Sequence, residues 1–177
     1  MNANFPACLA FVLAEEGGFV DNPDDPGGAT NAGITLETFQ DWHDGATVEA
    51  LKNISSADVQ GIYASNYWVP INGAGLPSGL DLMVFDHGVN AGPRRSALLL
   101  QRLLGVTQDS HIGPVTLAAV GSRSITELIA QLSGVQKAFY RSRPGFSEFG
   151  DGWIARLERR TKAALAMTGP PQPKETT

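Results

Sequence analysis

The segment from Leu80 to Val89 constrains the fold most, because it is apolar along almost its whole length. Only Asp81, Asp86 and His87 place titratable side chains in it. A helix that is apolar on every face has to be surrounded by other elements. With 177 residues, the chain is long enough to bury a substantial core. We therefore expect this segment to form a helix at the centre of the molecule.

Helix-initiating residues recur on both sides of this segment. Thr35 and Ser55 are suited to cap helices, and Ser124 opens a capping box with Glu127. Pro93 suits the first turn of a helix. The expected helices span residues 5–16, 36–42, 56–68, 80–89, 93–104, 114–120, 124–141 and 147–166.

Strand signals are weak by comparison. Residues 19–20 and 32–34 are the best candidates for a small β-hairpin. The expected fold class is therefore mainly α, a helical domain with two lobes and a small β-hairpin. Residues 169–177, GPPQPKETT, have the composition of a flexible tail.

Charge divides the chain into two halves. Residues 1–90 hold 12 acidic side chains and one basic side chain, a net charge of −11. Residues 91–177 hold 12 basic and 6 acidic side chains, a net charge of +6. This division fits either attraction between two lobes or a basic half that meets an anionic surface. A pI near 5.1 and the absence of a nucleic-acid motif argue against a nucleic-acid partner.

The N-terminal segment Phe5–Ala14 has the length of a signal-peptide core, but no basic residue precedes it. It continues directly into Glu15, so we expect a buried helix in a chain made in the cytoplasm without a signal peptide. The single cysteine, Cys8, fits a reducing compartment. No run approaches the roughly 18 apolar residues of a membrane span, so stable membrane insertion is not expected.

The stretch Glu15–Thr35 gathers acids and glycines in one loop. A calcium loop that starts at Asp21 would have Pro26 at its glycine position and Ala32 at its final glutamate position, which excludes it. The stretch has no lysine for a phosphate loop, and the three histidines and one cysteine lack metal-ligand spacing. Neither a metal nor another cofactor is therefore expected.

A glycosidase site accounts for this stretch. Such a site needs one carboxylic acid that protonates the leaving sugar oxygen and a second group that handles water. A glutamate at the end of an apolar helix is partly desolvated, which favours its protonated form. Nearby glycines leave space for a sugar. The alternative is a helix end followed by a solvated loop whose aspartates begin turns.

Three motifs carry a family resemblance. Residues 16–35, EGGFVDNPDDPGGATNAGIT, resemble the signature of glycoside hydrolase family 108, the N-acetylmuramidases of phage endolysins and secretion-associated bacterial enzymes. Residues 85–93, FDHGVNAGP, resemble the family's central motif. Residues 100–116, LQRLLGVTQDSHIGPVT, resemble its C-terminal predicted peptidoglycan-binding segment, with Ser110 where the family usually has glycine.

The resemblance implies a lysozyme-like fold with a catalytic lobe in residues 1–90 and a helical, peptidoglycan-binding lobe in residues 91–168. It implies Glu16 as the general acid, Asp25 as the partner carboxylate and Thr30 as a support for water. The spacing of phage-type lysozymes favours the register Glu15, Asp24 and Thr30 instead. The family motif, with its acid directly before two glycines, favours Glu16. Sequence alone supplies no carboxylate separation to distinguish inversion from retention.

Four residues outside this stretch are candidate substrate-binding residues: Trp68, Asp86, His87 and Asn90. Three of them have a structural alternative. Trp68 suits core packing, His87 suits a core position, and Asn90 is suited to cap the next helix.

The expected activity is hydrolysis of the β-1,4 bond between N-acetylmuramic acid and N-acetylglucosamine. The expected partner is the peptidoglycan glycan strand, cut by a monomer that reaches the periplasm or wall after holin-mediated release. Three alternatives stay open: a muramidase that assists protein secretion, a chitinase-type specificity and a non-catalytic peptidoglycan-binding module.

Overall fold

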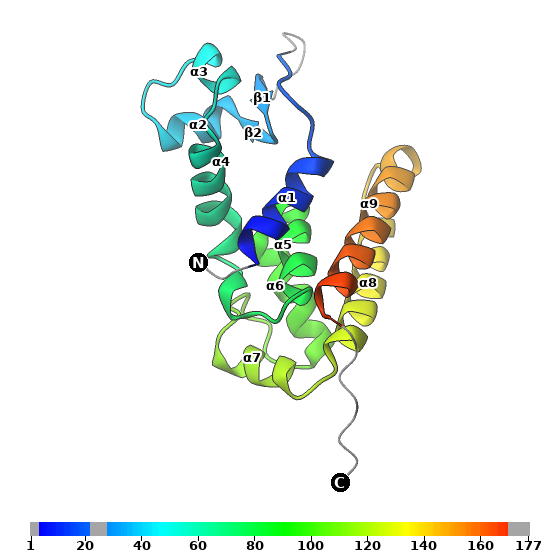
Figure 1. Cartoon of the computed structure of the whole chain (residues 1–177). Coiled ribbons are helices and arrows are strands. Elements are labelled where there is room, and N and C mark those ends of the chain that lie inside the picture. Colours follow the sequence, from blue (N-terminus) through cyan, green and yellow to red (C-terminus); the bar gives the residue numbers. More distant parts are fainter. Residues whose placement is uncertain (1–3, 22–27, 170–177) are drawn as a thin grey trace. The chain divides into compact units, whose positions relative to one another are not determined.

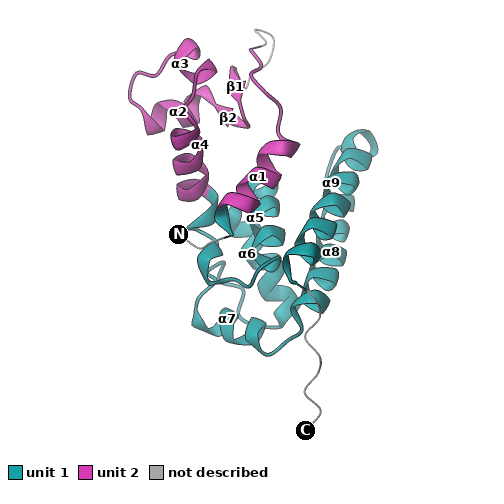
Figure 2. Ribbon diagram, in the orientation of Figure 1, with its two compact units in different colours: residues 1–5, 67–177 teal, residues 6–66 magenta. Residues whose placement is uncertain are grey.

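The computed structural model describes residues 4–21 and 28–169 (Figure 1). The described residues are mainly α-helical and contain one two-stranded antiparallel sheet, which confirms the expected fold class. None of their helices is long and apolar enough to cross a membrane. The chain forms two compact units, residues 6–66 and residues 1–5 with 67–177 (Figure 2). The expected functional division near residue 90 stays a prediction.

The unit of residues 6–66 contains most of the first helix, the sheet and three short helices. Its elements are α1 (Phe5–Glu15), β1 (Thr30–Asn31), β2 (Ile34–Thr35), α2 (Leu36–Trp42), α3 (Val48–Lys52) and α4 (Ser56–Tyr63). The chain continues from α4 into a π-helical turn, Ala64–Trp68. α1 contributes the buried side chains of Phe5, Cys8, Leu9 and Val12. The N-terminal apolar segment is therefore part of the folded core.

The predicted helix caps in this unit are confirmed. The Thr35 hydroxyl accepts a hydrogen bond from the Thr38 amide at 3.1 Å and begins α2. The Ser55 hydroxyl accepts one from the Asp58 amide at 3.1 Å and begins α4. Each cap satisfies an amide that has no partner within its own helix.

The hairpin has a different register from the one expected. Thr30 pairs with Thr35, and Asn31 pairs with Ile34, while Val20 forms an isolated bridge with Thr30. The prediction that residues 19–20 pair with residues 32–34 is wrong, because residues 32 and 33 form the turn. Ala32 has φ 50° and Gly33 has φ 72°, and a two-residue hairpin turn of this kind requires positive φ at both positions.

The second unit is built around α5 (Leu80–Ala91), whose residues from Leu80 to Gly88 are all buried. It is contacted by the 3-10 helix Gly73–Gly75 and by the α-helices α6 (Pro93–Leu104), α8 (Ile125–Arg141) and α9 (Phe146–Met167). α7 (Pro114–Gly121) packs on α6. The predicted central position of the Leu80–Val89 segment is therefore confirmed for this unit. Pro93 begins α6 as expected.

Candidate active site

Glu16 directly follows the last residue of α1. Its amide donates to the carbonyl of Val12 at 3.1 Å, so its backbone continues the final turn of the helix. The side chains of Glu15 and Glu16 are both partly buried. Burial therefore does not distinguish the two glutamates, and only their surroundings do.

The carboxyl group of Glu16 lies against the hairpin turn. A Cβ atom added to Gly33 would lie 3.1 Å from Glu16 Oε2 and 2.7 Å from the Tyr63 hydroxyl. The contact with the Tyr63 hydroxyl is shorter than real Cβ atoms show, and the contact with Glu16 is tighter than most, so a side chain at position 33 would have to displace the tyrosine hydroxyl. The glycine therefore brings the turn, the carboxyl group and the tyrosine hydroxyl together within one compact unit.

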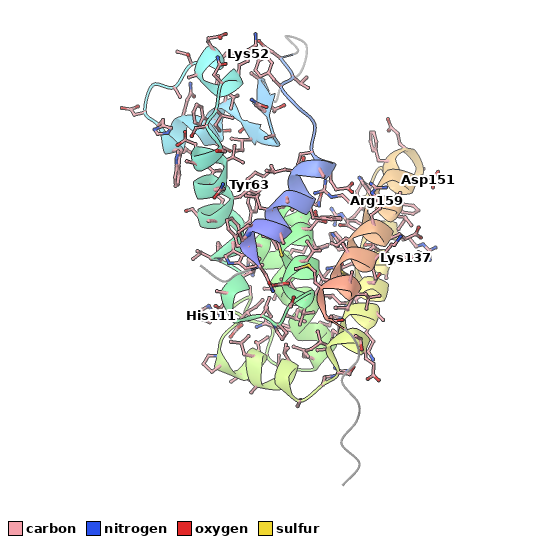
Figure 3. The ribbon with its side chains drawn as sticks, in the orientation of Figure 1. Lys52, Tyr63, His111, Lys137, Asp151 and Arg159 are labelled. Carbon is pink, nitrogen blue, oxygen red and sulfur yellow. The ribbon has the colours of Figure 1, made fainter. Side chains whose placement is uncertain are left out.

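Tyr63 holds this turn in place from the end of α4 (Figure 3). Its side chain is 1% exposed, and its hydroxyl donates to the carbonyl of Ala32 at 2.8 Å. Ala32 has a left-handed backbone, which is unfavourable for a residue with a Cβ atom. Such conformations persist where surrounding contacts stabilise them, and they occur often at functional sites.

Sequence reasoning missed both Gly33 and Tyr63 as members of the site. Gly33 lies inside the quoted motif, and its position after Asn31-Ala32 is a recognisable turn signal. Tyr63 offers no such signal, because it is distant in sequence from Glu16 and lies in an unremarkable helix.

Thr30 belongs to the same unit. Its amide and carbonyl both pair with Val20 at 2.8 Å, and Val20 lies four residues after Glu16. The loop after α1 is thereby tied to the strand that carries Thr30, whose side chain is partly buried. Asp24 and Asp25 lie outside the described residues.

Asp86 has a fully buried side chain in the unit of residues 1–5 and 67–177, which we call the helical unit. Its carboxylate forms ion pairs with Arg156 at 2.7 Å and with Arg160 at 2.5 Å. Arg160 also donates to Gln136, whose amide donates to the carbonyl of Met83. This network joins α5, α8 and α9, and it satisfies a charge whose isolated burial would be strongly unfavourable.

His87 and Trp68 are also buried, at 0% and 2% exposure. His87 packs against Phe139 and Tyr140, and neither of its ring nitrogens has a hydrogen-bond partner among the described residues. Burial, followed by the positive charges of Arg160 and Arg95, lowers the pKa of His87 to about 3. His87 is therefore neutral throughout the physiological pH range.

Trp68 packs against Phe5 and Phe85 within the helical unit. Asn90 is exposed, and its amide donates to the carbonyl of Asp86 at 2.8 Å. Asn90 does not cap α6, because the N-cap residue is Gly92, which has no side chain to accept a hydrogen bond from the first turn. Of the four candidate binding residues, Asn90 is the one with an accessible polar side chain. Among the described residues, no cluster of His, Cys, Asp or Glu has the geometry of a metal site.

Comparisons with known proteins identify the family. Residues 9–92, which include Glu16, Thr30, Gly33 and Tyr63, match the model of glycosyl hydrolase 108. The chain is also similar to the solved structure of SagA from Brucella abortus, with 38% sequence identity and a TM-score of 0.83. That similarity covers 94% of this chain and 97% of SagA. No curated protein sequence matches the chain.

The chain belongs to glycosyl hydrolase family 108. It is therefore a glycoside hydrolase, an N-acetylmuramidase that acts on peptidoglycan, with a mainly α, lysozyme-like fold. The match to the family model ends at residue 92, so a peptidoglycan-binding role for residues 91–168 stays a prediction.

Proposed function

We propose that this family 108 muramidase uses Glu16 as its general acid. The observation that supports the proposal is the position of the Glu16 carboxyl group against Gly33 and Tyr63. This position places the carboxyl group beside the hairpin turn and near a buried tyrosine hydroxyl, and a proton donor must be held close to the glycosidic oxygen.

In the proposed reaction, Glu16 protonates the oxygen that bridges N-acetylmuramic acid and N-acetylglucosamine. The bond from that oxygen to the anomeric carbon of N-acetylmuramic acid breaks as water attacks the carbon from the opposite face. Asp25 accepts the proton of this water, and the Thr30 hydroxyl orients it. Direct attack by water inverts the anomeric configuration. Proton NMR of freshly released sugar tests this step, because a product of retained configuration would require a covalent intermediate.

The first experiment measures the release of reducing ends from purified peptidoglycan by wild type, Glu16→Gln and Glu15→Gln. Glu15→Gln is the matched control, because it makes the same chemical change one residue away. We expect Glu16→Gln to lose about 10²–10⁴-fold in rate and Glu15→Gln to stay close to wild type. Circular dichroism checks the folding of all three proteins. The reverse order of activities would assign the acid to Glu15.

Mass spectrometry of the products identifies the sugar at each new reducing end. Muramic acid ends support the proposed specificity, whereas N-acetylglucosamine ends would contradict it. Folded wild type that binds peptidoglycan without cutting it would support the non-catalytic module.

For the biological role, we propose endolysin-type lysis of the cell wall. Its support is the resemblance of the motifs together with the inclusion of α1 in the core. The test expresses the protein in the bacterial cytoplasm with and without a pore-forming holin and follows culture turbidity. Lysis that requires the holin is expected. Intact cells in both cultures, despite activity on purified peptidoglycan, would favour the secretion-assisting alternative.

A further inference from the structure

A small pocket in the helical unit combines aromatic and basic side chains. It lies among α5, α6, α8 and α9 and has a volume of about 180 Å³. We call it the aromatic–basic pocket, and its principal lining residues are Asn90, Arg95, Phe139, Tyr140, Arg143 and Trp153. In the described part of the chain, no acidic side chain lines it.

Its two arginines are held on one aromatic ring. The guanidinium carbons of Arg95 and Arg143 lie over the ring of Phe139, at 5.6 Å and 5.4 Å from its centroid. Arg95 also donates to the carbonyl of Ala91 at 3.0 Å. Within residues 4–21 and 28–169, neither arginine forms an ion pair with a carboxylate. The two guanidinium groups are therefore positioned in advance and retain hydrogen-bond donors for an anion.

The rest of the lining suits a small apolar group. Tyr140 and Trp153 have their ring centroids 6.1 Å apart, and Tyr140 is 7% exposed. The volume is below the roughly 300–1,000 Å³ of sites that enclose a whole small molecule. The pocket therefore fits one terminal amino acid with its carboxylate, and it is too small for a disaccharide.

We propose that the aromatic–basic pocket binds a carboxylate of the peptide stems of peptidoglycan. This inference rests on the proposed function, which makes peptidoglycan the substrate. The glycan backbone of that polymer is uncharged once its lactyl groups carry peptides, so its negative charges lie on the stems. Arg95 and Arg143 bind the carboxylate, the aromatic rings contact the aliphatic part of the amino acid, and Asn90 is available to a peptide amide.

The direct test measures binding without catalysis. The probes are a synthetic stem tetrapeptide and the same peptide with every carboxyl group amidated, titrated calorimetrically and by intrinsic tryptophan fluorescence. The variants are Arg95→Ala/Arg143→Ala and the matched control Arg94→Ala/Arg141→Ala. The control removes the same charge from neighbouring exposed positions that do not line the pocket.

We expect wild type and the control variant to bind the acidic tetrapeptide at least tenfold more tightly than the amidated one. Arg95→Ala/Arg143→Ala should lose this tenfold preference. Equal binding of both peptides by wild type would overturn the proposal. An equal loss in the control variant would also overturn it, because that result would indicate attraction by net charge alone.

A kinetic test connects the pocket to hydrolysis. Wild type and Arg95→Ala/Arg143→Ala are compared on stem-bearing glycan and on the same glycan with the carboxyl groups of its stems amidated. We expect a tenfold higher KM for the variant on stem-bearing glycan, an unchanged kcat, and no difference on amidated glycan. A loss on both substrates would overturn the proposal. If wild type cuts neither glycan, the proposed function fails, whereas the peptide titration still decides the pocket.

Discussion

Replacing His87 with phenylalanine should remove most of the loss of stability that mild acid causes in this protein. His87 is completely buried, its ring nitrogens have no partners among the described residues, and its pKa is lowered to about 3. In the unfolded chain, the same side chain titrates near 6.5. Phenylalanine has no titrating group and is compatible with packing against Phe139 and Tyr140.

The sign of the effect follows from which state binds the proton. Between pH 6.5 and about 3, the unfolded chain binds a proton at His87 that the folded chain does not. The contribution of His87 to stability is therefore fully present above pH 6.5 and is lost as the pH falls. Each pH unit in this window corresponds to about 1.4 kcal/mol. Going from pH 7 to pH 5 should therefore lower the free energy of unfolding by about 2 kcal/mol through this residue alone.

Other titrating groups affect both proteins equally or act at lower pH. The pKa values of Asp58 and Asp109 are lowered, mainly by hydrogen bonds from Ser55 and from Gln101, so their contributions are lost only in stronger acid. Burial raises the pKa of Asp81, which has the opposite effect on stability and is common to wild type and variant. The difference between the two proteins therefore isolates His87.

The assay is urea unfolding at pH 7 and pH 5, followed by circular dichroism. Packing changes caused by phenylalanine do not depend on pH and cancel when each protein is compared with itself. His111→Phe is the control, because His111 is an exposed histidine of the same unit. Equal losses of stability for wild type and His87→Phe between the two pH values would refute this reasoning.

Three further predictions concern single contacts. Tyr63→Phe should lower kcat on peptidoglycan at least tenfold while lowering the free energy of unfolding by only about 1 kcal/mol, because it frees the strained turn beside Glu16. Tyr67→Phe is the control, and an equal loss of activity there would contradict the role of Tyr63. Ser110→Gly should raise the free energy of unfolding by about 0.5 kcal/mol, because Ser110 has φ 65°, a conformation that glycine adopts without strain. In thermal unfolding, a lower melting temperature would mean that the serine hydroxyl contributes more to stability than the backbone strain removes. Arg160→Met should lower the free energy of unfolding by about 3 kcal/mol, because it breaks a fully buried ion pair with Asp86. Urea unfolding measures this change, and a loss below about 1 kcal/mol would mean that the network contributes little.

Much of the fold was determined by local sequence. Thr35, Ser55 and Pro93 begin helices where their side chains or ring predicted, because caps and first-turn prolines act on the nearest backbone groups. The apolar segment from Leu80 to Gly88 had to be surrounded by other elements, and it is. The motif around Glu16 could also be recognised from the sequence, because its acids and glycines lie within one short stretch.

Tertiary structure decided which residues meet. The hairpin register depends on positive φ at Ala32 as well as at Gly33. The Tyr63 hydroxyl donates a hydrogen bond to the carbonyl of Ala32 in this conformation. The ion pairs of Asp86 with Arg156 and Arg160 join residues that are 70 or more positions apart in the sequence, so local sequence could not predict them. Sequence specifies hydrogen bonds and periodicity over a few residues, because those depend on local geometry. Burial and electrostatic environment depend on side chains from distant parts of the chain, and only the folded structure brings those together.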